Sequence, residues 1–210
     1  MNAYQEIKSD ISKLITNGLK LGLIVNPRAS DRIFHGNRIS SGYTFFDDEK
    51  EYIEKRRESY EKDLFLFALK DGAILQLNYE FDINKKVSTI SKINIAYLPA
   101  LDDSDKPLSS NYIRVDYDPG NKSNSIFHES THAHIGFYST PRIALSKIVR
   151  PSEFFELILF LFYPGDFTIW TKRNIPSGKY QTEKLGAKEL TKNKACSEWI
   201  QKFFHIENNI

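Results

Sequence analysis

Residues 64–81 read LFLFALKDGAILQLNYEF, a pattern that predicts paired β-strands. Both halves are rich in apolar side chains with the period of two that is typical of β-strands. Asp71-Gly72 stands between the halves, and Asp-Gly between two such runs is the strongest short-range signal for a β-hairpin. We therefore expect two antiparallel strands joined by a tight turn, the first beginning at Leu64 and the second covering 74–81.

Further strands follow along the chain. Residues 88–98 predict a third strand, which Pro99 ends, and the runs 111–117 and 132–138 predict two more. Less regular segments predict strands at 21–25 and 42–47, a loop over 27–41, a charged helix or loop over 48–62, and a C-terminal helix over 182–205.

Helices are expected both before and after these strands along the chain. Apolar residues recur on one helical face over 3–17, where Asn17-Gly18 supplies a stop signal. Pro151 opens another helix that continues to Phe162, and Pro164-Gly165 is expected to end it. The pattern indicates an α+β fold, with a central antiparallel β-sheet in meander order and N-terminal and C-terminal helices. We expect a single domain over residues 1–210.

Composition narrows the class of protein. Apolar residues make up 40% of the chain and aromatic residues 13%, which indicates a globular protein rather than a disordered one. The net charge of +2 neither requires nor excludes a nucleic-acid partner. The single cysteine, Cys196, fits a reducing compartment, and the apolar run 154–163 is too short to cross a bilayer. We expect a cytoplasmic protein without a membrane partner.

Three of the five histidines lie within seven residues, at His128, His132 and His134. They follow a strand-like run that contains Arg114 and Asp116. Since side chains alternate across a strand, Arg114 and Asp116 share one face of the first strand, and His132 and His134 share one face of the second. If these consecutive strands pair with their apolar faces toward the core, all four side chains lie on the same opposite face.

Two kinds of catalysis suit this set, and the residues alone leave both open. In metal-free acid–base catalysis on a phosphodiester, His132 and His134 give and take the proton, Arg114 stabilises the phosphate charge, Asp116 orients a histidine and His128 assists. No cofactor is favoured in that case. In the alternative, a divalent metal ion is held by the N/O ligand set of a metal-dependent hydrolase. Its ligands come from His128, His132, His134, Asp116 and Asp118.

A structural or binding role is the third possibility, with the same residues forming ion pairs in a polar pocket. The protein is then a non-catalytic partner, such as an immunity subunit, and associates with a neighbouring protein. Four further residues are candidates for a phosphate-binding rim, although a solvated loop explains them equally well: Arg28, Arg32, His35 and Arg38. Arg142 is close enough in sequence to join the histidine group, with a surface salt bridge as the alternative.

The stretch from Tyr112 to Pro119, followed by His128 and the run His132-Ala-His134-Ile-Gly136, resembles the signature of an uncharacterised bacterial family, a domain of unknown function. Its members carry Arg-x-Asp-Tyr-Asp and His-x-His-Ile-Gly. Proline often follows the earlier histidine, which is His128 in this chain, but here Glu129 follows it. The layout also resembles small bacterial toxin nucleases that present histidines on an antiparallel sheet. That resemblance implies an RNase or nuclease, acting on RNA in a toxin–antitoxin or phage-defence setting with a neighbouring antitoxin as its protein partner.

Overall fold

A computed structural model gives the arrangement of most of these elements. It describes residues 2–25, 33–41, 53–54, 67–84, 87–104, 106–109, 111–119, 131–136, 143–145 and 148–174. The strand expected at 42–47 and the helix expected at 182–205 lie outside the described residues, as does nearly all of the charged segment 48–62.

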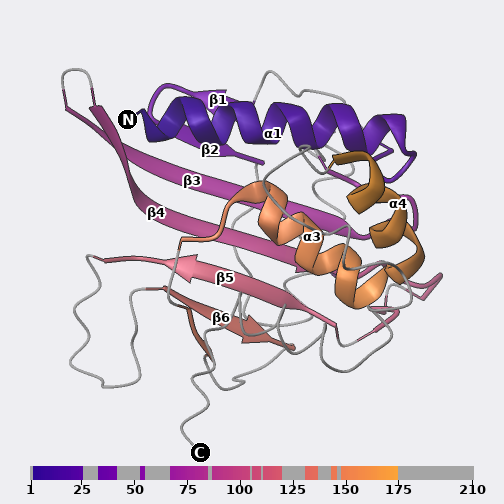
Figure 1. Ribbon diagram of the computed structural model, residues 1–210. Helices are drawn as coiled ribbons and strands as arrows, with labels where there is room; N and C mark the ends of the chain where they lie inside the picture. The colour runs from indigo at the N-terminus through magenta and orange to yellow at the C-terminus, as the bar shows by residue number, and fades with distance from the viewer. Residues whose placement is uncertain are drawn as a thin grey trace, which may run out of the picture.

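The centre of the molecule is a seven-stranded sheet in which every strand pairs antiparallel with the next one in sequence (Figure 1). Its strands are β1 (Phe34–His35), β2 (Arg38–Ser40), β3 (Ile74–Asn84), β4 (Val87–Leu98), β5 (Ile113–Tyr117), β6 (Thr131–Ile135) and β7 (Ile143–Ala144). The antiparallel meander predicted from the sequence is confirmed, and β3 to β6 occupy the segments where strands were expected.

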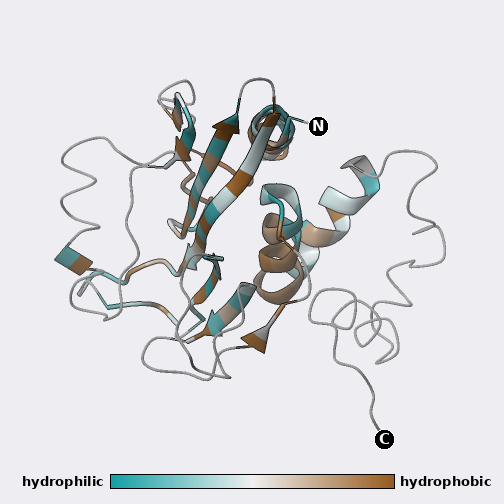
Figure 2. Cartoon of the chain, turned by 90° about the vertical axis from the view of Figure 1, so that its left-hand side faces the viewer, coloured by the Kyte–Doolittle hydropathy of each residue, from teal (hydrophilic) through white to brown (hydrophobic). Residues whose placement is uncertain are grey.

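Three helices lie together on one side of the strands (Figure 2). They are α1 (Ala3–Lys20), α3 (Pro151–Phe162) and α4 (Pro164–Asn174). Helix α1 begins at the N-cap Asn2, whose side chain accepts a hydrogen bond from the Gln5 N–H, and Asp10 accepts two from Ser152 at the start of α3. The helices and strands therefore form two layers, as expected for an α+β fold. Within the described residues, none of the helices combines the length and apolar character that crossing a membrane requires.

The core fills the space between the two layers. On the strand side it is formed by alternate residues whose register brings them onto one face: Ile39, Leu75, Leu77, Tyr79, Ile93, Ile95, Tyr97, Ile113, Val115 and Ala133. On the helix side it is formed by Ile7, Ile11, Leu14, Phe154, Phe155 and Ile158. Because alternation places one apolar side chain inward at every second position, the residues between them form the opposite face of the sheet.

The turn at Asp71-Gly72 is confirmed. Gly72 has a φ of +86°, a conformation that favours glycine, and Leu69 N–H donates to the Ala73 carbonyl. Ala68 pairs with Ile74 across the turn. The expected first strand of this hairpin lies partly outside the described residues, and 68–69 form only isolated bridges.

Two predictions on the N-terminal side were wrong. The segment 21–25 makes only a single bridge, from Ile24 to Leu69, instead of a strand. The loop expected over 27–41 contains the β1–β2 hairpin, in which Gly36, with a φ of +53°, and Asn37 form the turn. The two strands of this hairpin are too short and too polar to show the alternation that marks longer strands. Their pairing is completed by β3, which supplies hydrogen bonds that a short hairpin lacks by itself.

One expected helix stop differs from the structure, and the other is confirmed. Helix α1 continues past Asn17 to Lys20, and Gly18 packs directly against Ile24: a Cβ at position 18 would lie 2.5 Å from Ile24 Cδ1. Helix α3 covers Pro151–Phe162 as predicted, but Pro164 then opens α4, which the sequence analysis did not expect. Proline tolerates the first position of a helix, where its missing N–H has no partner to lose.

Candidate functional site

The four residues singled out on β5 and β6 do meet on one face. These strands pair so that Arg114 lies opposite His134 and Asp116 lies opposite His132. Directly paired residues point to the same side of a sheet. The shared face predicted from alternation is therefore confirmed, and it is the face turned away from the helices.

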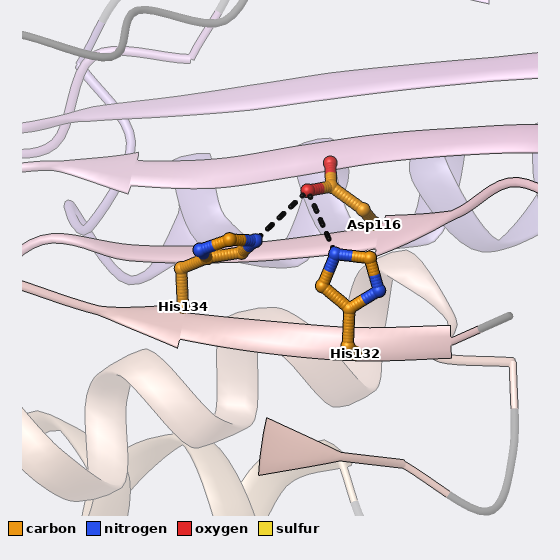
Figure 3. A group of neighbouring side chains, drawn as sticks. All are labelled: Asp116, His132 and His134. Atoms are coloured by element: carbon orange, nitrogen blue, oxygen red, sulfur yellow. Dashed lines mark ion pairs between the residues drawn. The ribbon is translucent and has the colours of Figure 1, made fainter. Parts of the chain in front are cut away.

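The Asp116 carboxylate lies at the centre of the group. Its Oδ2 atom is 3.6 Å from His132 Nε2 and 3.5 Å from His134 Nε2 (Figure 3). The same oxygen lies 2.6 Å from Arg114 Nε, and Arg114 Nη2 lies 3.0 Å from His134 Nε2. The two imidazole rings meet edge to face with their centroids 5.0 Å apart. A single carboxylate oxygen thus faces one guanidinium and two imidazoles.

The contact with Arg114 defines the role of one His134 nitrogen. A guanidinium can only donate hydrogen bonds, so His134 Nε2 is the acceptor in this contact. The distance from Asp116 to His132 exceeds the roughly 3.2 Å of an ordinary N–H···O bond. Asp116 therefore faces His132 as a nearby negative charge rather than as a hydrogen-bond acceptor.

Burial strengthens these interactions. The side chains are only 9% exposed for His132, 10% for Arg114, and 14% for Asp116 and His134. Charges interact more strongly where water is scarce. Arg114 and Asp116 compensate each other, so the group carries no net charge while its histidines are neutral.

Amide side chains from β3 and β4 extend the group, and the sequence analysis missed them. Asn94 pairs with Asp116 across the sheet, and its Nδ2 donates a 2.8 Å hydrogen bond to Asp116 Oδ1. Gln76 donates in turn to Asn94 Oδ1. The sequence did contain a signal for these two residues. Gln76 and Asn94 are polar residues within otherwise apolar runs, and each lies on the strand face opposite the core, as Arg114 does on β5.

Other candidates lie apart from this group or outside the described residues. Asp118 forms an ion pair with Lys92 at 3.5 Å and is not among the residues close enough to share a metal with the histidines. Arg38 is 62% exposed and lies 3.6 Å from Glu80, and His35 is exposed on β1. The remaining candidates lie outside the described residues: His128, Arg28, Arg32 and Arg142. Their roles stay predictions.

Three of the residues could also hold a metal ion. One ligand atom from each of Asp116, His132 and His134 lies within 4.8 Å of the others. Carboxylate oxygen and imidazole nitrogen suit Zn, Mn or Fe. The position of Arg114 opposes this use, because its guanidinium already contacts both Asp116 Oδ2 and His134 Nε2. A metal ion would have to displace a positive charge from two of its ligands.

The fold and the site together define an α+β protein with a histidine–aspartate–arginine cluster on the polar face of an antiparallel sheet. The chain belongs to a family of uncharacterised conserved proteins, DUF2290, whose model matches residues 25–207. This confirms the expected membership of an uncharacterised family. No match was found among curated proteins or among solved structures.

Proposed function

We propose that the protein is a metal-independent phosphodiesterase whose substrate class is RNA. The observation that carries the proposal is the contact of one carboxylate, Asp116, with Arg114 and with two histidines on a nearly buried face. This set unites a positive charge for a phosphate with two groups that exchange protons near neutral pH.

The roles follow from the chemistry of RNA cleavage. One histidine takes the proton of the 2′-hydroxyl as its oxygen attacks phosphorus, and the other gives a proton to the 5′-oxygen as the P–O bond breaks. Arg114 stabilises the charge that develops on the phosphate oxygens. Asp116 stabilises whichever imidazole is protonated. RNA is preferred because its 2′-hydroxyl is an internal nucleophile, so no water has to be activated by a metal.

The test is cleavage of RNA oligonucleotides by the purified full-length chain in the presence of EDTA. We expect His132→Gln and His134→Gln each to lose activity by about 100-fold or more and to keep the wild-type circular dichroism spectrum. His35→Gln is the matched control, because His35 is an exposed histidine on β1, and it should keep full activity. Undiminished cleavage by His134→Gln would refute the assignment.

A metal-dependent hydrolase is the second candidate, favoured by the close grouping of Asp116, His132 and His134. Elemental analysis of protein purified without chelator separates the two candidates. Near-stoichiometric metal in the wild type, lost in His132→Ala/His134→Ala, would replace the first proposal. If the wild type cleaves neither RNA nor DNA, with or without added metal, the proposal of a non-catalytic binding subunit gains support instead.

A further inference from the structure

A chain of amide side chains crosses the polar face of the sheet and ends at Asp116. Gln76 on β3 donates to Asn94 Oδ1 on β4, and Asn94 Nδ2 donates to Asp116 Oδ1 on β5, at 2.8 Å. Asn94 and Asp116 are direct partners across the sheet, whereas Gln76, which pairs with Ala96, reaches Asn94 diagonally. Three consecutive strands are thus joined through side chains that lead toward the histidines.

The direction of this chain is determined by its last member. A carboxylate can only accept, so Asn94 must turn its NH₂ group toward Asp116 and its oxygen toward Gln76. Gln76 supplies the N–H that this orientation requires. The two oxygens of Asp116 then have separate partners: Oδ1 is held by Asn94, and Oδ2 faces Arg114 and the histidines.

The burial of Gln76 makes glutamine a costly residue at this position. Gln76 is 0% exposed, and among the described residues its Oε1 atom has no hydrogen-bond partner. A buried acceptor without a partner destabilises a fold, and an apolar side chain of similar length would avoid this cost. The contact that glutamine makes and methionine could not make is the hydrogen bond to Asn94.

We propose that Gln76 and Asn94 are positioning residues, which hold the Asp116 carboxylate so that Oδ2 faces both His132 and His134. The consequence for catalysis rests on the proposed function, but the positioning itself does not. Asn78 offers a contrast on the same face of β3. It lies directly opposite Asn94, but its Oδ1 accepts from Ser40 Oγ at 2.8 Å and from Ser41 N–H at 3.2 Å, and these two bonds tie β2 to β3.

The experiment compares Gln76→Met, Gln76→Glu and the control Asn78→Ala in the full chain. Each protein is studied by urea unfolding, by steady-state RNA cleavage, and by ¹⁵N NMR of the imidazole nitrogens. These nitrogen shifts distinguish the Nδ1–H and Nε2–H forms. Assignment uses His132→Gln and His134→Gln.

For Gln76→Met we expect stability equal to or above that of the wild type. We also expect kcat to fall by about tenfold with little change in KM, as is typical when a partner of a site residue is lost, and altered ¹⁵N shifts for His132. Gln76→Glu should have a larger effect, because a carboxylate turns the Asn94 amide around and points its oxygen at Asp116. Asn78→Ala should lose stability and keep wild-type imidazole shifts.

Wild-type imidazole shifts and wild-type kcat in both Gln76 variants would overturn the proposal. If Gln76→Met does not fold, Asn94→Leu takes its place, because it removes the Asn94 N–H contact to Asp116 directly. The NMR readout needs no substrate. If the wild type proves inactive on RNA, that result refutes the phosphodiesterase alone, and the imidazole shifts still decide whether Gln76 positions Asp116.

Discussion

The two faces of the sheet are made by the same strands and differ completely in chemistry. On β4, Ile95 faces the helices and is fully buried, whereas its neighbour Asn94 faces the histidine group. On β5, Val115 belongs to the core and Asp116 to the site. Burying one face is sufficient to hold a strand in an antiparallel sheet, so the other face can carry polar groups.

The polar face of the sheet is not a solvated surface. Its central side chains are nearly buried and contact one another, and such groups are tolerated only when their partners are present. We therefore expect a charged side chain on the core face to lower the free energy of unfolding strongly. On the polar face, losing one member of the charged pair Arg114–Asp116 should destabilise the fold, whereas replacing both members should be tolerated.

The largest effect is expected where a charge enters the core face. Ile95→Asp buries a carboxylate without a partner and should lower the free energy of unfolding by about 5 kcal/mol, which approaches the whole stability of an ordinary domain. Thermal melting followed by circular dichroism should show no cooperative transition. The control Val87→Asp lies on the same strand at a position 49% exposed and should melt like the wild type. A cooperative melt of Ile95→Asp near the wild-type temperature would contradict the assignment of this face.

An intermediate effect is expected for the ion pair on the polar face. Arg114→Met and Asp116→Leu each leave a nearly buried charge unpaired, and each should cost about 3 kcal/mol of the free energy of unfolding. The double variant should cost less than either single one, because no unpaired charge remains. Urea unfolding of the four proteins measures this coupling. Strictly additive losses would show that the pair is solvated rather than buried.

The smallest effect concerns a hydroxyl on the core face. Tyr79→Phe removes the hydrogen bond to the Val149 carbonyl and should cost about 1 kcal/mol at pH 7. Burial, followed by the negative charges of Asp10 and Glu153, raises the pKa of Tyr79 well above its usual value, although Arg150 opposes this. The folded-state pKa thus exceeds the unfolded value of about 10. The stability that the neutral hydroxyl contributes is therefore complete below about pH 10 and is lost as the pH rises further.

The stability gap between the wild type and Tyr79→Phe should accordingly shrink above about pH 10. Urea unfolding of both proteins at pH 7 and at a pH about one unit above the free-tyrosine value checks this. The other tyrosines are common to both proteins and cancel in the comparison. An unchanged gap would mean that the Tyr79 hydroxyl ionises equally easily in the folded and unfolded chains.

Much of the fold was predictable because the signals are local. Alternation marked β3 to β6, and Gly72 supplied the positive φ that its turn requires. The errors fell where packing between distant segments overrides a local signal. Gly18 resembles a helix stop, but in the structure it lies inside α1, where it packs closely against Ile24. The β1–β2 hairpin depends on pairing with β3, which its own residues do not indicate.

Alternation and a single strand pairing are sufficient to predict that Arg114, Asp116, His132 and His134 share a face. The contacts of these side chains with other strands could be identified only from the folded chain. Gln76 and Asn94, which connect to Asp116, come from strands that are distant in sequence. Asp118 forms an ion pair with Lys92 and does not join the histidine group. The physical reason is that the face of a side chain depends on the local backbone, whereas its partner depends on the register between strands, which the whole core sets.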